Sequence, residues 1–177
     1  EHGVDAVRMV MCSYPLGESI KFGPGIFKEQ INPFFRTLWN TYYYITSYLE
    51  RFDLSGEEVH SVSTLEDEWM LSKTNSMVAK VTEHLEQYEF NHGISTVMDF
   101  ANNVLSRTYI KLIRDRANSA DKELAYVLKF ALDKVIRCVA PFAPFSSEQL
   151  YQEFLKTDDS EWSVHFDGFP KAMESNP

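Results

Sequence analysis

Residues 100–116 carry four positively charged side chains that could hold phosphate groups. The stretch reads FANNVLSRTYIKLIRDR, and its apolar residues recur near the 3.6-residue period of an amphipathic helix. Arg107, Lys111 and Arg114 follow at spacings of four and three, which predicts one shared helix face, and Arg116 adds a fourth charge. A cationic face beside a packed apolar face can bind a phosphate backbone. The simpler interpretation is a solvated face paired with nearby carboxylates.

The overall charge makes this cluster a local exception. The chain has 26 acidic and 17 basic residues among 177, which gives a formal net charge of −9. Indiscriminate binding to nucleic acid, DNA included, needs a basic surface. The acidic balance therefore argues against a general nucleic-acid binder, but it does not exclude a small basic site.

Residues that could catalyse a reaction or ligate a metal do not form a convincing site. Glu57–His60 and Glu89–His92 have the Glu-x-x-His spacing found in di-iron helix bundles, but one lies in a polar stretch and the other at a helix start. His84 and His165 have no Cys or His partner at zinc-ligand spacing. No Gly-x-Ser-x-Gly nucleophile elbow occurs. We expect no catalytic residue, metal site or cofactor in this chain.

Apolar periodicity predicts the helices that must position the cations. Pro and Gly residues at 15–25 form the clearest linker, and strand is almost absent except for a possible extended segment at 162–170. Short connections favour an antiparallel helix bundle, so the predicted fold class is all-α. Helices are expected at about 4–12, 26–52, 64–88, 93–117, 119–139 and 146–155.

Several side chains are expected to start helices or fill the core. Thr64 with Asp67 and Ser146 with Gln149 resemble capping boxes, and Ser119 is a plausible N-cap. The predicted core combines apolar residues from separate helices. They are Trp69, Leu105, Leu112, Val127, Leu132 and Phe145.

Aromatic residues and cysteines complete the expectations from composition. The run Tyr42–Tyr44 covers nearly all sides of its helix and is expected to pack, with stacking of one ring on an RNA base as the alternative. Cys12 and Cys138 are too few for a disulfide framework. No apolar run reaches the roughly 18 residues of a membrane span. These features predict a cytoplasmic protein with reduced thiols.

Six separated stretches, in the same order, resemble those of class Ia aminoacyl-tRNA synthetases. Within that family the isoleucyl enzymes fit best, and the valyl enzymes are the alternative. Thr108 departs from the pattern, because the family usually carries an aromatic residue there. The stretches are GVDAVR at 3–8, TLWN at 37–40, LEDEWMLSK at 65–73, LSRTYIKLIR at 105–114, VAPFAPF at 139–145 and SVH at 163–165.

The resemblance implies a domain division and partners. Residues 1–22 would be the tail of a stem-contact region, and residues 23–177 an anticodon-binding helical domain. The implied partners are the anticodon arm of a tRNA and the catalytic domain of the same parent chain, whose enzyme joins isoleucine to tRNA using ATP and Mg²⁺.

The resemblance also implies which residues bind and what the chain lacks. The family's His-Ile-Gly-His and Lys-Met-Ser-Lys-Ser motifs are absent from this sequence. We therefore expect a fragment that binds RNA and does not catalyse, with a non-catalytic protein-interaction bundle as the alternative. The expected RNA-binding residues are Arg107, Lys111, Arg114, Arg116, Trp39 and Asn40.

Overall fold

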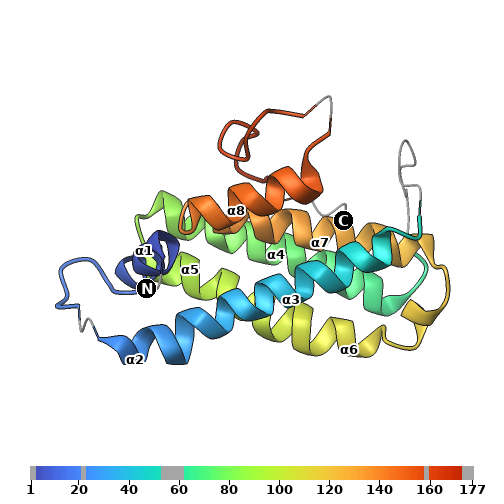
Figure 1. Ribbon diagram of the computed structural model, residues 1–177, viewed down its shortest axis with the longest axis horizontal. Helices are drawn as coiled ribbons and strands as arrows, with labels where there is room; N and C mark the ends of the chain where they lie inside the picture. Colours follow the sequence, from blue (N-terminus) through green and yellow to red (C-terminus); the bar gives the residue numbers. More distant parts are fainter. Residues whose placement is uncertain (1–2, 21–22, 53–61, 158–159, 173–177) are drawn as a thin grey trace.

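Helices form all the regular secondary structure in the residues that the computed structural model describes, which are 3–20, 23–52, 62–157 and 160–172 (Figure 1). The all-α prediction is confirmed for these ranges. The α-helices are α1 (Val4–Cys12), α2 (Pro24–Ile26), α3 (Asn32–Leu49), α4 (Leu65–Glu86), α5 (Phe90–Asp99), α6 (Ile110–Leu112), α7 (Lys122–Val139) and α8 (Pro144–Leu150). Three segments have π conformation, η1 (Phe27–Ile31), η2 (Phe100–Tyr109) and η4 (Tyr151–Leu155), and η3 (Arg116–Asn118) is a 3-10 turn.

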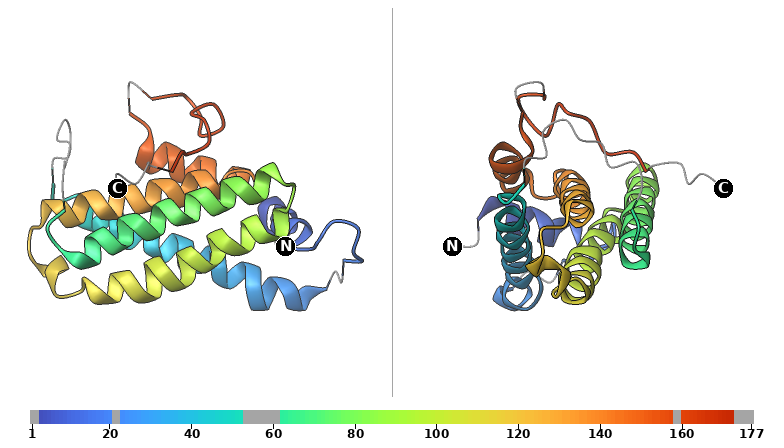
Figure 2. Two further views of the ribbon diagram at one scale, coloured as in Figure 1. Left: turned by 180° about the vertical axis from the view of Figure 1, so that it is seen from behind. Right: turned by 90° about the vertical axis from the view of Figure 1, so that its right-hand side faces the viewer.

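Several of these elements join end to end into longer rods. The segments α2, η1 and α3 form one, and α5, η2 and α6 form another. α3 packs on η2 and α7, while α4 packs on α5 and α7, so that four rods surround one core (Figure 2). The pairs α4–α5 and α3–α7 are antiparallel, whereas α4 runs in the same direction as α7, and α3 in the same direction as the α5–α6 rod.

The core draws on every rod, and its membership corrects part of the sequence prediction. Leu105, Val127 and Leu132 are buried, as expected. Leu112 and Phe145 were wrongly assigned to the core, because they are 57% and 68% exposed. Trp69 is only half-buried at the edge of the core.

The error at Leu112 has its cause in the winding of η2. A π-helix bonds each N–H to the fifth residue back, so a turn holds more residues than the 3.6 of an α-helix. A row of side chains spaced by four residues would drift around an α-helix, but wider turns keep it facing the core. The buried row on this rod is Val97, Ala101, Leu105, Tyr109 and Ile113.

Helix starts also differ from the sequence prediction. Asp121, and not Ser119, caps α7, because its side chain accepts a hydrogen bond from the Leu124 N–H. Thr64 precedes α4 without a side-chain cap bond.

The helix α8 starts earlier than predicted, and its cap comes from a distant residue. It begins at Pro144 rather than Ser146. The carboxylate of Asp5, on α1, accepts hydrogen bonds from the backbone N–H groups of Phe145 and Ser146 at 3.3 and 2.6 Å. This carboxylate satisfies donors that a helix start leaves unpaired, so α1 is fastened to α8.

Two further observations concern extended structure and membranes. The described part of the possible extended segment 162–170 forms turns and bends and no strand. Among the residues described, no helix combines the length and the apolar character that crossing a bilayer requires.

The register of the α5–α6 rod is testable with two neighbouring substitutions. Ile113→Ala should lower the free energy of unfolding by about 2–5 kcal/mol, because Ile113 is 1% exposed and its truncation leaves a cavity. Leu112→Ala should change it by no more than about 0.5 kcal/mol, as expected for an exposed site. Urea unfolding of both variants measures the difference. Equal losses, or a larger loss for Leu112→Ala, would contradict the observed register.

Candidate nucleic-acid interface

Arg107 and Lys111 lie exposed on the outer side of the α5–α6 rod, opposite to its buried row. The Arg107 guanidinium donates to Asn103 Oδ1 at 3.1 Å, and the Asn103 amide donates to Asp99 Oδ1 at 2.7 Å. These bonds align Asp99, Asn103 and Arg107 along the rod. Both cations remain open to solvent, so they can meet an anionic ligand.

Arg114 is exposed in the turn that follows α6, and it borders α3. It lines a cavity of about 480 Å³ together with Tyr43 and Tyr44 of α3 and Arg51, just beyond that helix. Burial raises the pKa of the Tyr44 hydroxyl, while the positive charges of Arg114 and Arg51 oppose that rise. The cavity therefore combines aromatic rings with two guanidinium groups.

The three adjacent tyrosines of α3 have different environments. Tyr42 is buried, and its hydroxyl donates to Glu153 Oε2 at 3.0 Å; burial and this hydrogen bond raise its pKa to about 12. Tyr44 is half-buried. Tyr43 is 59% exposed. Only part of this run packs between helices, and Tyr43 offers a ring to solvent.

Trp39 and Asn40 are adjacent in the sequence but lie on different faces of α3. Trp39 is half-buried and lines a separate cavity of about 590 Å³ with Phe35 and Phe145, at the α1 side. Asn40 is exposed one helical turn before Tyr44, which puts both on one face of α3. Asn40 thus lies near the Arg114 cavity along the helix, and Trp39 faces another one.

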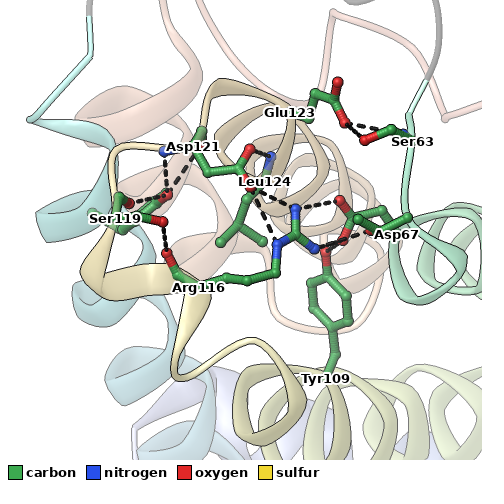
Figure 3. Close-up of polar contacts among 10 residues, drawn as sticks. Ser63, Asp67, Tyr109, Arg116, Ser119, Asp121, Glu123 and Leu124 are labelled. Atoms are coloured by element: carbon green, nitrogen blue, oxygen red, sulfur yellow. Dashed lines mark hydrogen bonds and ion pairs between the residues drawn. The ribbon is translucent and has the colours of Figure 1, made fainter.

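Arg116 has a different role from the other three cations (Figure 3). Its guanidinium donates to both oxygens of Asp67 at 3.0 Å each and to Asp121 Oδ2 at 2.7 Å. It also donates to the Thr64 hydroxyl at 3.0 Å. The hydrogen bond to Asp67 is the largest cause that raises the Arg116 pKa. The simpler sequence interpretation, a cation paired with nearby carboxylates, describes this residue.

Asp67 is the buried member of this cluster. Its side chain has no exposed surface, and it also accepts a hydrogen bond from the buried Tyr109 hydroxyl at 2.6 Å. A buried carboxylate requires a paired cation and hydrogen-bond donors. Asp67 at the start of α4 therefore binds η2 through Tyr109 and η3 through Arg116, instead of capping its own helix.

Sequence analysis missed Arg51, which belongs to the same face of α3 as the cavity. Its spacing of four from Ser47 and seven from Tyr44 was the available signal. The signal was weak because a single cation at this spacing is less conspicuous than the four within residues 100–116. Its guanidinium donates to the Ala117 carbonyl at 3.1 Å, so it bridges α3 and η3.

The possible metal ligands serve other purposes where the structure describes them. His84 Nδ1 lies 2.8 Å from Glu89 Oε2 and so links the end of α4 to the start of α5. Within the described ranges no group of three His, Cys, Asp or Glu side chains could hold a metal ion. Glu57–His60 lies outside the described residues.

The sequence of this helical bundle matches a known family. The sequence profile of the family described as "Anticodon-binding domain of tRNA ligase" matches residues 67–176. The chain belongs to this family.

Curated relatives make the relationship more specific. The isoleucine–tRNA ligase of Thermus thermophilus is 32% identical over 97% of this chain and 17% of its own length. That of Methanocaldococcus jannaschii is 35% identical over 93% of this chain and 16% of its own length. The valine–tRNA ligase of Archaeoglobus fulgidus is 28% identical over 98% of this chain and 20% of its own length. The chain thus spans a fifth or less of these relatives.

A solved structure has the same fold. It is a leucyl-tRNA synthetase of Agrobacterium radiobacter, crystallised as a ternary complex with tRNA and LeuAMS, and it matches with a TM-score of 0.72. The match covers 97% of this chain and 20% of the synthetase, at 19% identity. At this identity the likeness establishes the fold.

The structural role of Arg116 predicts a large loss of stability when it is replaced. Arg116→Met should lower the free energy of unfolding by about 3 kcal/mol or more, because it leaves the Asp67 carboxylate buried without its cation. Arg114→Met, at an exposed position two residues earlier, should change it by no more than about 0.5 kcal/mol. Urea unfolding compares the two variants. Similar small effects for both would rule out the ion-pair cluster as a stabilising element.

The same cluster predicts how stability depends on pH. Burial works to raise the Asp121 pKa, but hydrogen bonds from the Leu124 N–H and Arg116 outweigh it and hold that pKa below its usual value. The unfolded chain therefore takes up this proton at higher pH than the folded protein, so the contribution is complete above about pH 4 and is lost as the pH falls further.

Asp121→Asn isolates this effect, since Asn can still cap α7. We expect the variant to be less stable than the original protein at pH 7, and the difference to shrink between about pH 4 and pH 2. Denaturant unfolding across this range provides the measurement. A difference that stays constant with pH would contradict the assignment.

Proposed function

We propose that this chain holds the anticodon arm of a tRNA as part of a cytoplasmic isoleucine–tRNA ligase. The observation that carries the proposal is the exposed set Arg107, Lys111 and Arg114, on the α5–α6 rod and in the turn directly after it, in a protein whose net charge is −9. Membership of the anticodon-binding family and the isoleucine–tRNA ligases among its relatives support it. The catalytic domain of the parent chain would be the second partner.

The three exposed cations are the proposed phosphate contacts. Arg107 and Lys111 are four residues apart and lie about one helical turn from each other, and Arg114 follows in the turn after α6, so the three can follow neighbouring phosphates. Arg116 is left out of the interface, because its guanidinium already binds two carboxylates. Asn40 remains a proposed contact. Trp39 is assigned an indirect part, since its ring lies 6.1 Å from that of Tyr43 and supports it.

The chemistry of the parent enzyme follows from the same assignment. We infer that it activates isoleucine with ATP, with Mg²⁺ bound to the nucleotide, and esterifies the tRNA in regions outside this chain. Valine is the second candidate amino acid, because a valine–tRNA ligase matches over 98% of this chain at 28% identity. The higher identity of the isoleucine enzymes favours isoleucine.

A salt series with tRNA tests the phosphate contacts. Each contact to a single-stranded region contributes about 0.7 to the slope of log affinity against log salt, so three contacts predict roughly −2. Arg114→Glu should weaken binding to all tRNAs and flatten the slope by about one unit. Lys80→Glu is the matched control, because Lys80 is an exposed cation on α4, which packs away from α3.

The expected result is a loss for Arg114→Glu and the original affinity and slope for Lys80→Glu. Filter binding or fluorescence anisotropy provides the measurement. If both variants bind with the original affinity and slope, the three cations form only a solvated face. A protein-interaction bundle is then the better supported function.

A further inference from the structure

The cavity between α3 and η3 combines aromatic rings with positively charged side chains. Its volume of about 480 Å³ falls within the range of pockets that bind small ligands. Aromatic rings of α3 line one side, and the guanidinium groups of Arg51 and Arg114 come from the turns that follow α3 and α6. The residues that concern its chemistry are Tyr43, Tyr44, Ser47, Arg51, Arg114 and Asn118.

The floor and the η3 wall of this cavity are fixed by contacts with the rest of the bundle. The Arg51 guanidinium lies 5.5 Å from the centre of the Tyr48 ring and donates to the Ala117 carbonyl. The Tyr48 hydroxyl in turn donates to the backbone carbonyls of Ser119 and Asp121. These bonds hold Arg51 in place before any ligand arrives, which reduces the entropy lost on binding.

The aromatic wall is also held in place. The Tyr43 ring meets the Tyr42 ring at 5.2 Å and an interplanar angle of 62°, and it lies 6.1 Å from the Trp39 ring. Tyr43 is nevertheless 59% exposed. A large, supported and exposed ring is suited to stacking on another planar group, and it loses little side-chain entropy in doing so.

From this arrangement we propose that the cavity takes one unpaired nucleotide of the bound RNA loop. The base stacks on the Tyr43 ring, and its flanking phosphate meets Arg114 and Arg51. The inference rests on the proposed function, because it places one nucleotide of the same RNA. It adds the position at which the protein distinguishes a single strand from a duplex.

The geometry of the cavity favours an unpaired nucleotide over a paired one. The Tyr43 ring lies in the hollow between α3 and η3. A base can reach this ring only when it is not stacked between its neighbours in a duplex. Bases in loops meet this condition, and proteins commonly hold them on aromatic rings and guanidinium planes. The exposed Asn118 and Ser47 at the rim can offer hydrogen bonds to the edge of the base.

The test uses the 177-residue chain and an RNA hairpin with a seven-nucleotide loop. Tyr43→Ala should weaken binding about five- to a hundredfold, the range found when a stacking ring is removed, while Tyr43→Phe should bind like the original protein. The control is Tyr88→Asn, which removes a similarly exposed tyrosine at the turn between α4 and α5; Asn tolerates the positive φ of that position.

A second arm replaces each loop nucleotide in turn by an abasic one. At one loop position the abasic hairpin should lose about as much affinity as Tyr43→Ala, and the two changes together should lose no more than either alone, as expected for two partners in contact. A fully paired duplex of equal length should bind more weakly than the hairpin, and Tyr43→Ala should not weaken it further.

The outcomes separate this inference from the proposed function. If the hairpin binds and Arg114→Glu weakens it, but Tyr43→Ala binds as the original does, the cavity holds no base and the phosphate contacts stand. If the affinity loss from Tyr43→Ala and the loss from the abasic nucleotide are independent at every loop position, no loop base stacks on Tyr43. If the hairpin does not bind at all, both proposals are overturned.

Discussion

The structure depends on the pairing of Arg116 with the buried carboxylate of Asp67. A carboxylate with no exposed surface is stable only when a cation and further donors satisfy it, and Arg116 with Tyr109 meet this need. Asp121 binds the same guanidinium and caps α7. One ion-pair cluster therefore fixes the starts of α4 and α7, the rod that contains η2, and the turn η3 between them (Figure 3).

The cluster also determines which cations remain for a ligand. Arg116, in η3, is bound to two carboxylates inside the bundle, whereas Arg107 and Lys111 on the α5–α6 rod and Arg114 in the turn after it are exposed. The π winding of η2 keeps the buried row of that rod on the core, and the exposed row is thereby kept on the solvent side. The tightly held end of the bundle is also where Arg51 and Arg114 meet the rings of α3.

The acidic surface and a proposed RNA interface are compatible, because part of the negative charge has structural tasks. Asp5 caps α8 from α1. Glu148 accepts hydrogen bonds from Ser163 and from the Val164 N–H, which hold the segment after η4 against α8. The proposed site is consequently local: a few cations and one exposed ring bind the RNA, and the surrounding negative charge limits binding elsewhere.

Local pattern in the sequence determined the helices, the outward position of Arg107, Lys111 and Arg114, and the burial of Leu105, because these follow from helical periodicity alone. The tertiary structure decided the rest. Periodicity assumes 3.6 residues per turn and could not place Leu112 on a π-wound rod. It also cannot pair groups that are far apart in the chain, such as Arg116 and Asp67, which lie 49 residues apart. Such pairs arise only when the packing of the helices brings a buried charge and its partner together.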